Sequence, residues 1–312
     1  MAQNGKGPDP KLSVSIFKKT IQSLDAHLQT PERAPEWNIE EELQKSIKTS
    51  RLNSAELSQP LCTAIQVARV HTFASIGVYP AAVVGHSSGE VAAAYAVGAI
   101  TANEAIAIAF YRGLVAQLQT KSGAMAAIVM GSKEIQDVTI AGDTEAVKNM
   151  TTKVIKESHP DVMARLLQVD MAARSFPRRL PTKLFFSSVQ DKLLTEASAF
   201  GPRYWQQNME SRVLFSPAVS SIIQHDISKN AVFLEVGPHS ALAGPLRQIQ
   251  ANHSTSLTYI SALVRHENDV ESFLTCIRKL FTVNVEVDLT KVIAKGSILP
   301  DLPRYPWNHS ER

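Results

Sequence analysis

The sequence contains two cysteines, no dense run of one charge and no long apolar stretch. Cys62 and Cys276 lie far apart, which gives neither a disulfide framework nor the spacing of a zinc site and favours a reducing compartment. Residues 1–7 lack the apolar core of a signal peptide, and no apolar run reaches membrane-spanning length. These absences predict a cytoplasmic protein that holds no metal and has no membrane partner.

Charge and composition exclude a further class of function. The 312 residues carry a net charge of +3 without a Lys/Arg tract, which argues against nucleic acid as a partner. Apolar residues make up 44% of the chain, and that share predicts a globular protein. Its length allows one large domain or two modest ones.

The most informative stretch is residues 81–90, an apolar run that ends in Gly-His-Ser-Ser-Gly at residues 85–89. Small helix-forming residues follow it, so the context is the strand, tight turn and helix of a Gly-x-Ser-x-Gly nucleophile elbow. Its two glycines have no Cβ, which allows a sharp turn and a helix close to the strand. Ser87 would stand at the helix N-terminus, where the Ser88 N–H can stabilise an oxyanion. The flanking patterns disfavour the alternative, a chance match in a loop.

Other patterns predict the elements around this turn. Apolar residues at helical spacing indicate a helix over residues 14–28, and Pro60 fits the first turn of another. Thr101 and Glu104 have the spacing of a capping box. Strands are predicted at residues 123–130, 138–142, 164–170, 184–189, 232–236 and 257–260, with an edge strand at 283–289. Strands that alternate with helices predict an α/β protein, here with a small inserted α+β subdomain.

Two further segments carry polar residues of interest. Arg112 lies on a predicted helix among apolar neighbours. Most helix arginines are solvated, and the alternative is a ligand for a carboxylate. The buried strand at 232–236 runs into a turn that contains His239. Ligands bind at the carboxyl ends of parallel strands, so His239 would lie near Ser87 if the two strands are neighbours.

Several motifs occur in the order found in a known family. They are Ser58-Gln59-Pro60, Gly85-His86-Ser87-Ser88-Gly89-Glu90, Tyr111-Arg112-Gly113, Gly123-Ala124-Met125-Ala126 and Glu235-Val236-Gly237-Pro238-His239-Ser240. Together they resemble the malonyl-CoA:acyl-carrier-protein acyltransferase domain of fungal-type reducing polyketide synthases, over roughly residues 12–312. The Pro-rich segment 302–309 is similar to the linker that follows this domain.

The resemblance implies a parallel-sheet, α/β-hydrolase-like core with a shortened ferredoxin-like subdomain. The segments would be a disordered start at 1–11, a core at 12–123 and 183–260, the subdomain at 124–172, a loop at 173–182 and a linker at 261–312.

The resemblance also implies a ping-pong acyl transfer in secondary metabolism. Ser87 would attack the thioester of malonyl-CoA, and the phosphopantetheine thiol of an acyl carrier protein would then take the acyl group. Arg112 would grip the free carboxylate with two parallel hydrogen bonds, while Gln59 and His86 would belong to the substrate site. The implied partners are the carrier protein and other polyketide synthase domains, and no bound cofactor is implied.

The sequence departs from the family pattern in two places. Residues 1–11 stand where the family has a strand and a Gly-Gln-Gly turn that supplies a second oxyanion donor. The family's catalytic histidine turn is missing after Asp170, where the chain runs on toward Leu184. A serine without a base is a poor nucleophile. His239 is the substitute candidate, although in the family its loop supports the catalytic histidine through backbone groups.

Three functions therefore stay open. The first is an acyltransferase, and the second is a catalytically impaired fragment or remnant that serves as a folded module. The third is an esterase or thioesterase, which would require an acid in a loop before His239. No convincing Asp or Glu stands there, so this function is the least favoured.

Overall fold

The structure, a computed structural model, describes residues 11–30, 34–46, 48–52, 54–117, 123–128, 138–143 and 177–292. The helices are α1 (Lys11–Leu28), α2 (Ile39–Gln44), α3 (Ala55–Ser75), α4 (Gly89–Ala96), α5 (Ala102–Gln117), α8 (Pro202–Glu210), α9 (Phe215–Gln224), α10 (Ala243–Asn252) and α11 (Asp269–Thr282). The strands are β1 (Ala82–Val84), β2 (Gly123–Ile128), β3 (Val138–Asp143), β4 (Leu184–Ser187), β5 (Lys192–Leu194), β6 (Val232–Glu235) and β7 (Thr258–Ser261).

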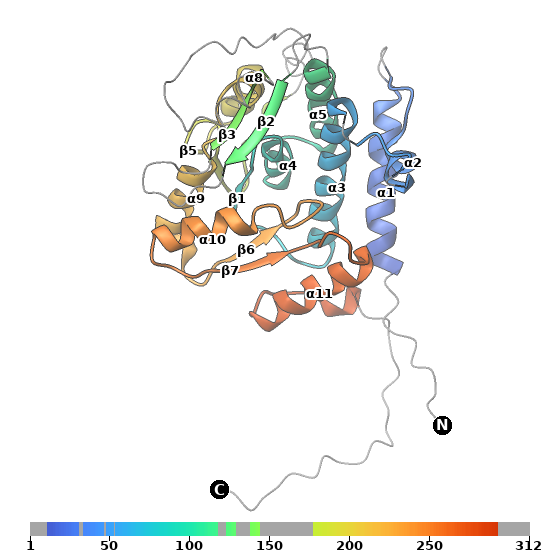
Figure 1. Ribbon diagram of the computed structural model, residues 1–312. Coiled ribbons are helices and arrows are strands. Elements are labelled where there is room, and N and C mark those ends of the chain that lie inside the picture. Colours follow the sequence, from blue (N-terminus) through green and yellow to red (C-terminus); the bar gives the residue numbers. More distant parts are fainter. Residues whose placement is uncertain are drawn as a thin grey trace, which may run out of the picture.

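The strands form short parallel pairs, as the α/β prediction requires. β1 pairs in parallel with β4, which also pairs with β5 in the antiparallel direction, and β6 pairs in parallel with β7 (Figure 1). β2 and β3 form an antiparallel pair. Within the described ranges, no ladder joins β1 to β6. Whether a strand of the family's sheet is missing here stays a prediction.

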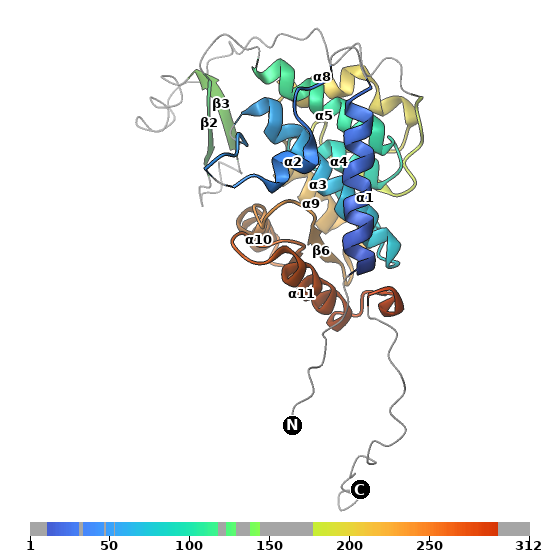
Figure 2. The ribbon, with the colours of Figure 1, turned by 90° about the vertical axis from the view of Figure 1, so that its right-hand side faces the viewer.

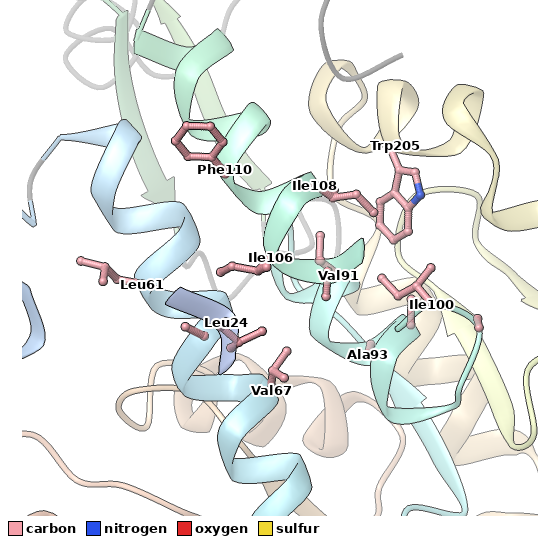
Figure 3. Close-up of a cluster of buried hydrophobic side chains, with 14 of the residues drawn as sticks. Leu24, Leu61, Val67, Val91, Ala93, Ile100, Ile106, Ile108, Phe110 and Trp205 are labelled. Atoms are coloured by element: carbon pink, nitrogen blue, oxygen red, sulfur yellow. The ribbon is translucent and has the colours of Figure 1, made fainter. Parts of the chain in front are cut away.

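A large hydrophobic core lies between the helices and the β1–β4 sheet. Helices α1, α3 and α5 lie side by side, with α4 next to them (Figures 1 and 2). The core joins Leu24 of α1, Leu61 of α3, Val91 of α4 and Ile108 of α5, and Trp205 of α8 reaches the same cluster (Figure 3). Because these side chains are almost fully buried, the core fixes the helices that carry the candidate site.

A second cluster packs α11 against the end of α3. Phe273 and Phe73 lie with ring centroids 5.3 Å apart. The guanidinium of Arg69 lies between Phe273 and Phe17, 4.7 and 4.9 Å from their ring centroids. Cation–π contacts of this kind join α1, α3 and α11. Whether α11 belongs to a linker that begins at residue 261 stays a prediction, as do the other domain boundaries.

The predicted edge strand at 283–289 is wrong. After α11 the chain makes a turn and then runs without a strand partner into a single 3-10 turn, Leu289–Lys291. Val285 and Val287 pack against the second cluster, and the N–H of Asp288 donates to the carbonyl of Ile76 at 2.8 Å. The alternating apolar residues here partly bury their side chains in this cluster, which accounts for the pattern without a strand.

The prediction that Pro60 opens a helix is also wrong, because α3 begins at Ala55 and Pro60 lies inside it.

The capping box is confirmed: the Thr101 N–H donates to Glu104 Oε2 at 2.6 Å, and the Glu104 N–H donates to Thr101 Oγ1 at 3.2 Å. The predicted strand at 164–170 and most of the inserted subdomain lie outside the described residues.

Helices α3 and α5 approach closely at Gly113. A Cβ at this position would lie 2.7 Å from the carbonyl oxygen of Ala55 and 3.1 Å from Cα of Glu56. Both contacts are with backbone, which cannot move aside as a flexible side chain can. Gly113 therefore lets α5 lie against the first turn of α3, and this contact brings Arg112 next to Gln59.

A buried carboxylate joins the elbow helix to α8 and β4. Glu90, fully buried at the start of α4, accepts hydrogen bonds from the Ser188 N–H at 2.6 Å and the Ser188 hydroxyl at 2.8 Å. The hydroxyl of Tyr204 and the N–H of Gly85 also donate to it. Burial nevertheless raises the pKa of Glu90 to about 7. Four donors thus hold this side chain among three elements.

Gly113→Ala is expected to destabilise the fold although alanine is the better helix former. Overpacking costs about 1–3 kcal/mol, which exceeds the gain of about 1 kcal/mol from replacing glycine in a helix. The matched control is Gly244→Ala in α10, where nothing lies within 4 Å of the new Cβ. Thermal unfolding followed by circular dichroism should show a lower midpoint for Gly113→Ala alone. Equal midpoints would contradict the close approach.

Glu90 predicts a fall in stability as the pH rises. The folded chain keeps the Glu90 proton up to about pH 7, whereas an unperturbed glutamate has a pKa of 4.5. Its contribution to the free energy of unfolding is complete below about pH 4.5 and is lost by pH 7. The difference in this free energy between the two pH values is about 3 kcal/mol. Glu90→Gln should remove this slope, and Glu210→Gln, at an exposed position on α8, should keep it. Urea unfolding between about pH 4 and pH 8 measures both, and identical slopes in the two variants would refute the assignment.

Candidate active site

Ser87 lies in the turn between β1 and α4 with a φ of 54°, in the left-handed region that a side chain adopts at a cost of about 1–2 kcal/mol. A Cβ on Gly85 would lie 2.2 Å from the Glu90 backbone nitrogen, so only glycine fits there. Gly89 differs, because its Cβ would meet only Gln66 Nε2 at 3.9 Å. Of the two glycines in the motif, the sharp turn therefore requires Gly85.

The start of α4 turns backbone N–H groups toward the elbow. The N–H groups of Gly89, Glu90 and Val91 bond to the carbonyls of residues 86, 87 and 88, at 2.9, 3.2 and 3.1 Å. Among the described residues, no hydrogen bond uses the N–H of Ser88. An N–H at a helix N-terminus can donate to an oxyanion, and the role predicted for Ser88 stays a prediction.

Arg112 is buried on α5, with 4% of its surface exposed. Its Nε donates to Gln59 Oε1 at 3.1 Å, and its Nη1 donates to Asn208 Oδ1. Burial lowers the pKa of Arg112 to about 10, so it is still a cation at neutral pH. Within the described part of the chain, no carboxylate lies within ion-pair distance of it. A buried charge held only by neutral oxygens is costly, and a bound carboxylate would offset that cost.

The arginine and the serine are joined by one side chain. Asn208, on α8 and 6% exposed, accepts from Arg112 through Oδ1 and donates from Nδ2 to the Ser87 carbonyl at 3.0 Å. The structure therefore brings Ser87, Arg112 and Gln59 to one place, from α3, α5 and the elbow. The roles that the sequence predicts for them stay predictions.

The two histidines of the predicted site lie in different surroundings. The His86 ring packs edge-on against Phe215, with centroids 5.2 Å apart. His239 follows β6, and burial together with the charge of Arg265 lowers its pKa. Among the described residues, the His239 ring makes no hydrogen bond to Ser87. The structure thus does not pair His239 with the serine hydroxyl.

Glu235 organises the loop that carries His239. Its carboxylate accepts from the Leu242 N–H, with oxygens at 3.1 and 3.3 Å, and from the hydroxyl of Tyr259. Burial raises the pKa of Glu235. Because this carboxylate is occupied by its own loop and by β7, it supports the loop conformation.

Sequence reasoning missed Asn208, Glu90 and Tyr204. Tyr204 and Asn208 stand four residues apart on α8, so they share one face of the helix. Their spacing, together with the neighbouring Trp205, is the signal that was present. The sequence context of Glu90 did not indicate a buried carboxyl group, because a glutamate in the first turn of a helix is common.

Within the described ranges, no group of three or more His, Cys, Asp or Glu side chains is placed to hold a metal ion. A search of the same residues finds no helix with the length and apolarity to cross a membrane. Cys276 is buried and Cys62 is partly buried, and both are free thiols.

Comparisons with known proteins identify the family of this chain. A family model described as "Acyl transferase domain" matches residues 12–287. The chain is 47% identical over 337 residues to a highly reducing polyketide synthase, sphB, of Aspergillus fumigatus, with 97% of this chain covered. It is 42% identical over 327 residues to another, g433, of Fusarium sp., with 94% covered. It spans 13% of the length of each of these relatives.

Solved structures show the same fold. The acyltransferase domain from module 8 of the salinomycin polyketide synthase matches with a TM-score of 0.74 at 20% identity, covering 91% of this chain and 72% of that one. A loading acyltransferase from the avermectin polyketide synthase matches with a TM-score of 0.71 at 21% identity, covering 89% of this chain and 98% of that one.

The resemblance inferred from the motifs is thus confirmed across most of the sequence. The chain belongs to the acyl transferase domain family, and its relatives are highly reducing polyketide synthases of fungi.

Proposed function

We propose that this domain transfers a short dicarboxylic acyl group, such as malonyl, from coenzyme A to an acyl carrier protein through an ester on Ser87. The observation that carries the proposal is the buried cation Arg112, which lacks a carboxylate partner among the described residues and is joined through Asn208 to the elbow. A guanidinium matches a carboxylate in plane and can bind both of its oxygens. Acyl groups without that carboxylate would leave the charge uncompensated.

The proposed reaction has two displacements on one serine. The Ser87 oxygen bonds to the thioester carbonyl carbon, the C–S bond breaks, and coenzyme A leaves as a thiol that carries the serine proton. The pantetheine thiol of the carrier protein then attacks the ester, and its proton returns to the Ser87 oxygen. The Ser88 N–H would donate to the oxyanion of both tetrahedral intermediates. The reaction needs no resident cofactor.

Partners follow from the same proposal. After Ser87, the second acceptor of the acyl group is the pantetheine thiol of an acyl carrier protein. The other domains of a polyketide synthase would bring this carrier protein to the site. The relatives that this chain matches are about eight times its length, since the chain spans 13% of each.

A second candidate function is favoured by the surroundings of His239. Its ring makes no hydrogen bond to Ser87 among the described residues, and without a proton acceptor a serine loses several orders of magnitude in rate. A catalytically impaired domain would still bind the dicarboxylic acyl group at Arg112. An esterase is less favoured, because an ester without a free carboxylate has no use for the buried guanidinium.

Incubation with malonyl-CoA should form a covalent adduct on Ser87. Intact mass spectrometry would show the added mass of one malonyl group, and peptide mapping would place it on Ser87. The Ser87→Ala variant is the control and should stay unlabelled. If the unchanged chain stays unlabelled at millimolar substrate, the impaired domain becomes the better assignment.

Arg112→Ala should lower the preference for malonyl-CoA over acetyl-CoA. Hydrogen bonds to a charged group contribute about 1.5–3 kcal/mol, so the ratio of the two acylation rates should fall roughly 10- to 100-fold. Arg203→Ala is the matched control, since it removes an exposed arginine from α8. Turnover of p-nitrophenyl esters that is lost in Ser87→Ala but kept in Arg112→Ala would favour the esterase instead.

A further inference from the structure

Asn208 holds the two ends of the candidate site at a fixed separation. Arg112 can only donate and the Ser87 carbonyl can only accept, so the amide has one satisfied orientation, with Oδ1 toward the guanidinium and Nδ2 toward the carbonyl. The Nδ2 to carbonyl distance is 3.0 Å. Asn208 is 6% exposed, so water has little access to replace either bond.

Helix α8 is itself held firmly against the elbow. Tyr204, one helical turn before Asn208, donates to Glu90, and its hydroxyl lies 2.9 Å from Ser187 Oγ. Trp205 is fully buried, and its indole N–H donates to the Phe200 carbonyl at 3.1 Å. The amide therefore cannot follow a displaced guanidinium without disturbing these contacts.

The Ser87 carbonyl receives two donors. The Glu90 N–H reaches it at 3.2 Å and Asn208 Nδ2 at 3.0 Å. Ser87 has a φ of 54°, and such a backbone persists only where its surroundings determine it. Asn208 thus contributes to the conformation that presents the serine hydroxyl, as well as to the placement of Arg112.

We propose that Asn208 is a positioning residue that couples acyl-group selection at Arg112 to acylation at Ser87. This inference rests on the proposed function. One rigid amide sets the distance between the group that binds the carboxylate and the group that attacks the thioester. The site would then select dicarboxylic thioesters by length, so that malonyl is accepted and succinyl, which is one methylene longer, is disfavoured.

The experiment compares Ser87 acylation by malonyl-, succinyl- and acetyl-CoA in the unchanged chain and in Asn208→Ala. A parallel measurement follows Ser87 labelling by phenylmethylsulfonyl fluoride, an uncharged serine reagent. Asn208→Ala should lower the malonyl-to-succinyl and malonyl-to-acetyl ratios at least tenfold and should also slow sulfonyl labelling. Arg203→Ala, exposed on the same helix, should change none of these.

A double variant tests whether Asn208 acts through Arg112. If it does, Asn208→Ala combined with Arg112→Ala should have the malonyl-to-acetyl ratio of Arg112→Ala alone, because the effects of coupled residues do not add. If the double variant instead lowers the malonyl-to-acetyl ratio by the product of the two single-variant factors, the two residues act independently and the proposed coupling is refuted. Far-UV circular dichroism and thermal midpoints of all variants identify any general loss of structure.

Asn208→Asp keeps the shape of the side chain if the alanine variant fails to fold. Its carboxylate would occupy the guanidinium and would face the Ser87 carbonyl as a second acceptor. The malonyl-to-acetyl ratio should again fall at least tenfold. A malonyl-to-acetyl ratio within twofold of that of the unchanged chain refutes the positioning role of Asn208 but leaves the proposed function standing. Failure of the unchanged chain to acylate Ser87 refutes the proposed function itself.

Discussion

The candidate site depends on a buried cation that neutral side chains hold in place. Arg112 is 4% exposed, and its described partners are the side-chain oxygens of Gln59 and Asn208. Removing a charge from water costs several kcal/mol, by the order of magnitude known for buried ions, and amide oxygens return only part of that. Among the described residues no carboxylate pairs with this guanidinium, which is the basis for proposing it as the group that binds a ligand carboxylate. The close packing at Gly113 keeps Arg112 next to Gln59.

The fold keeps its buried carboxylate separate from this cation. Glu90 is fully buried at the start of α4 and, among the described residues, forms no ion pair with Arg112. Instead, Tyr204 and Ser188 donate to Glu90, while Asn208 accepts from Arg112. Helix α8 supplies the partner on each side, four residues apart. Helix α8 thus supplies a donor to Glu90 and an acceptor for Arg112.

Local patterns predicted most of the elements, because each depends on residues near in sequence. The elbow follows from Gly85 and Ser87, and the capping box follows from Thr101 and Glu104. Asn208 could not be found in this way, because its partner Arg112 lies 96 positions away and contact at that separation depends on how α8 packs. The predicted strand at 283–289 failed for a related reason, since its apolar side chains pack against the second cluster while its backbone has no strand partner among the described residues.

The elbow does not depend on a continuous sheet. β1 pairs with β4, whereas β6 and β7 form a separate pair among the described residues. Two buried side chains hold the Ser87 turn. Asn208 donates to the Ser87 carbonyl, and Glu90 accepts from the N–H groups of Gly85 and Ser188. These contacts form without a ladder between β1 and β6 among the described residues. If Ser87 is the nucleophile proposed above, the lack of a proton acceptor would lower the rate of its acylation without disturbing these contacts.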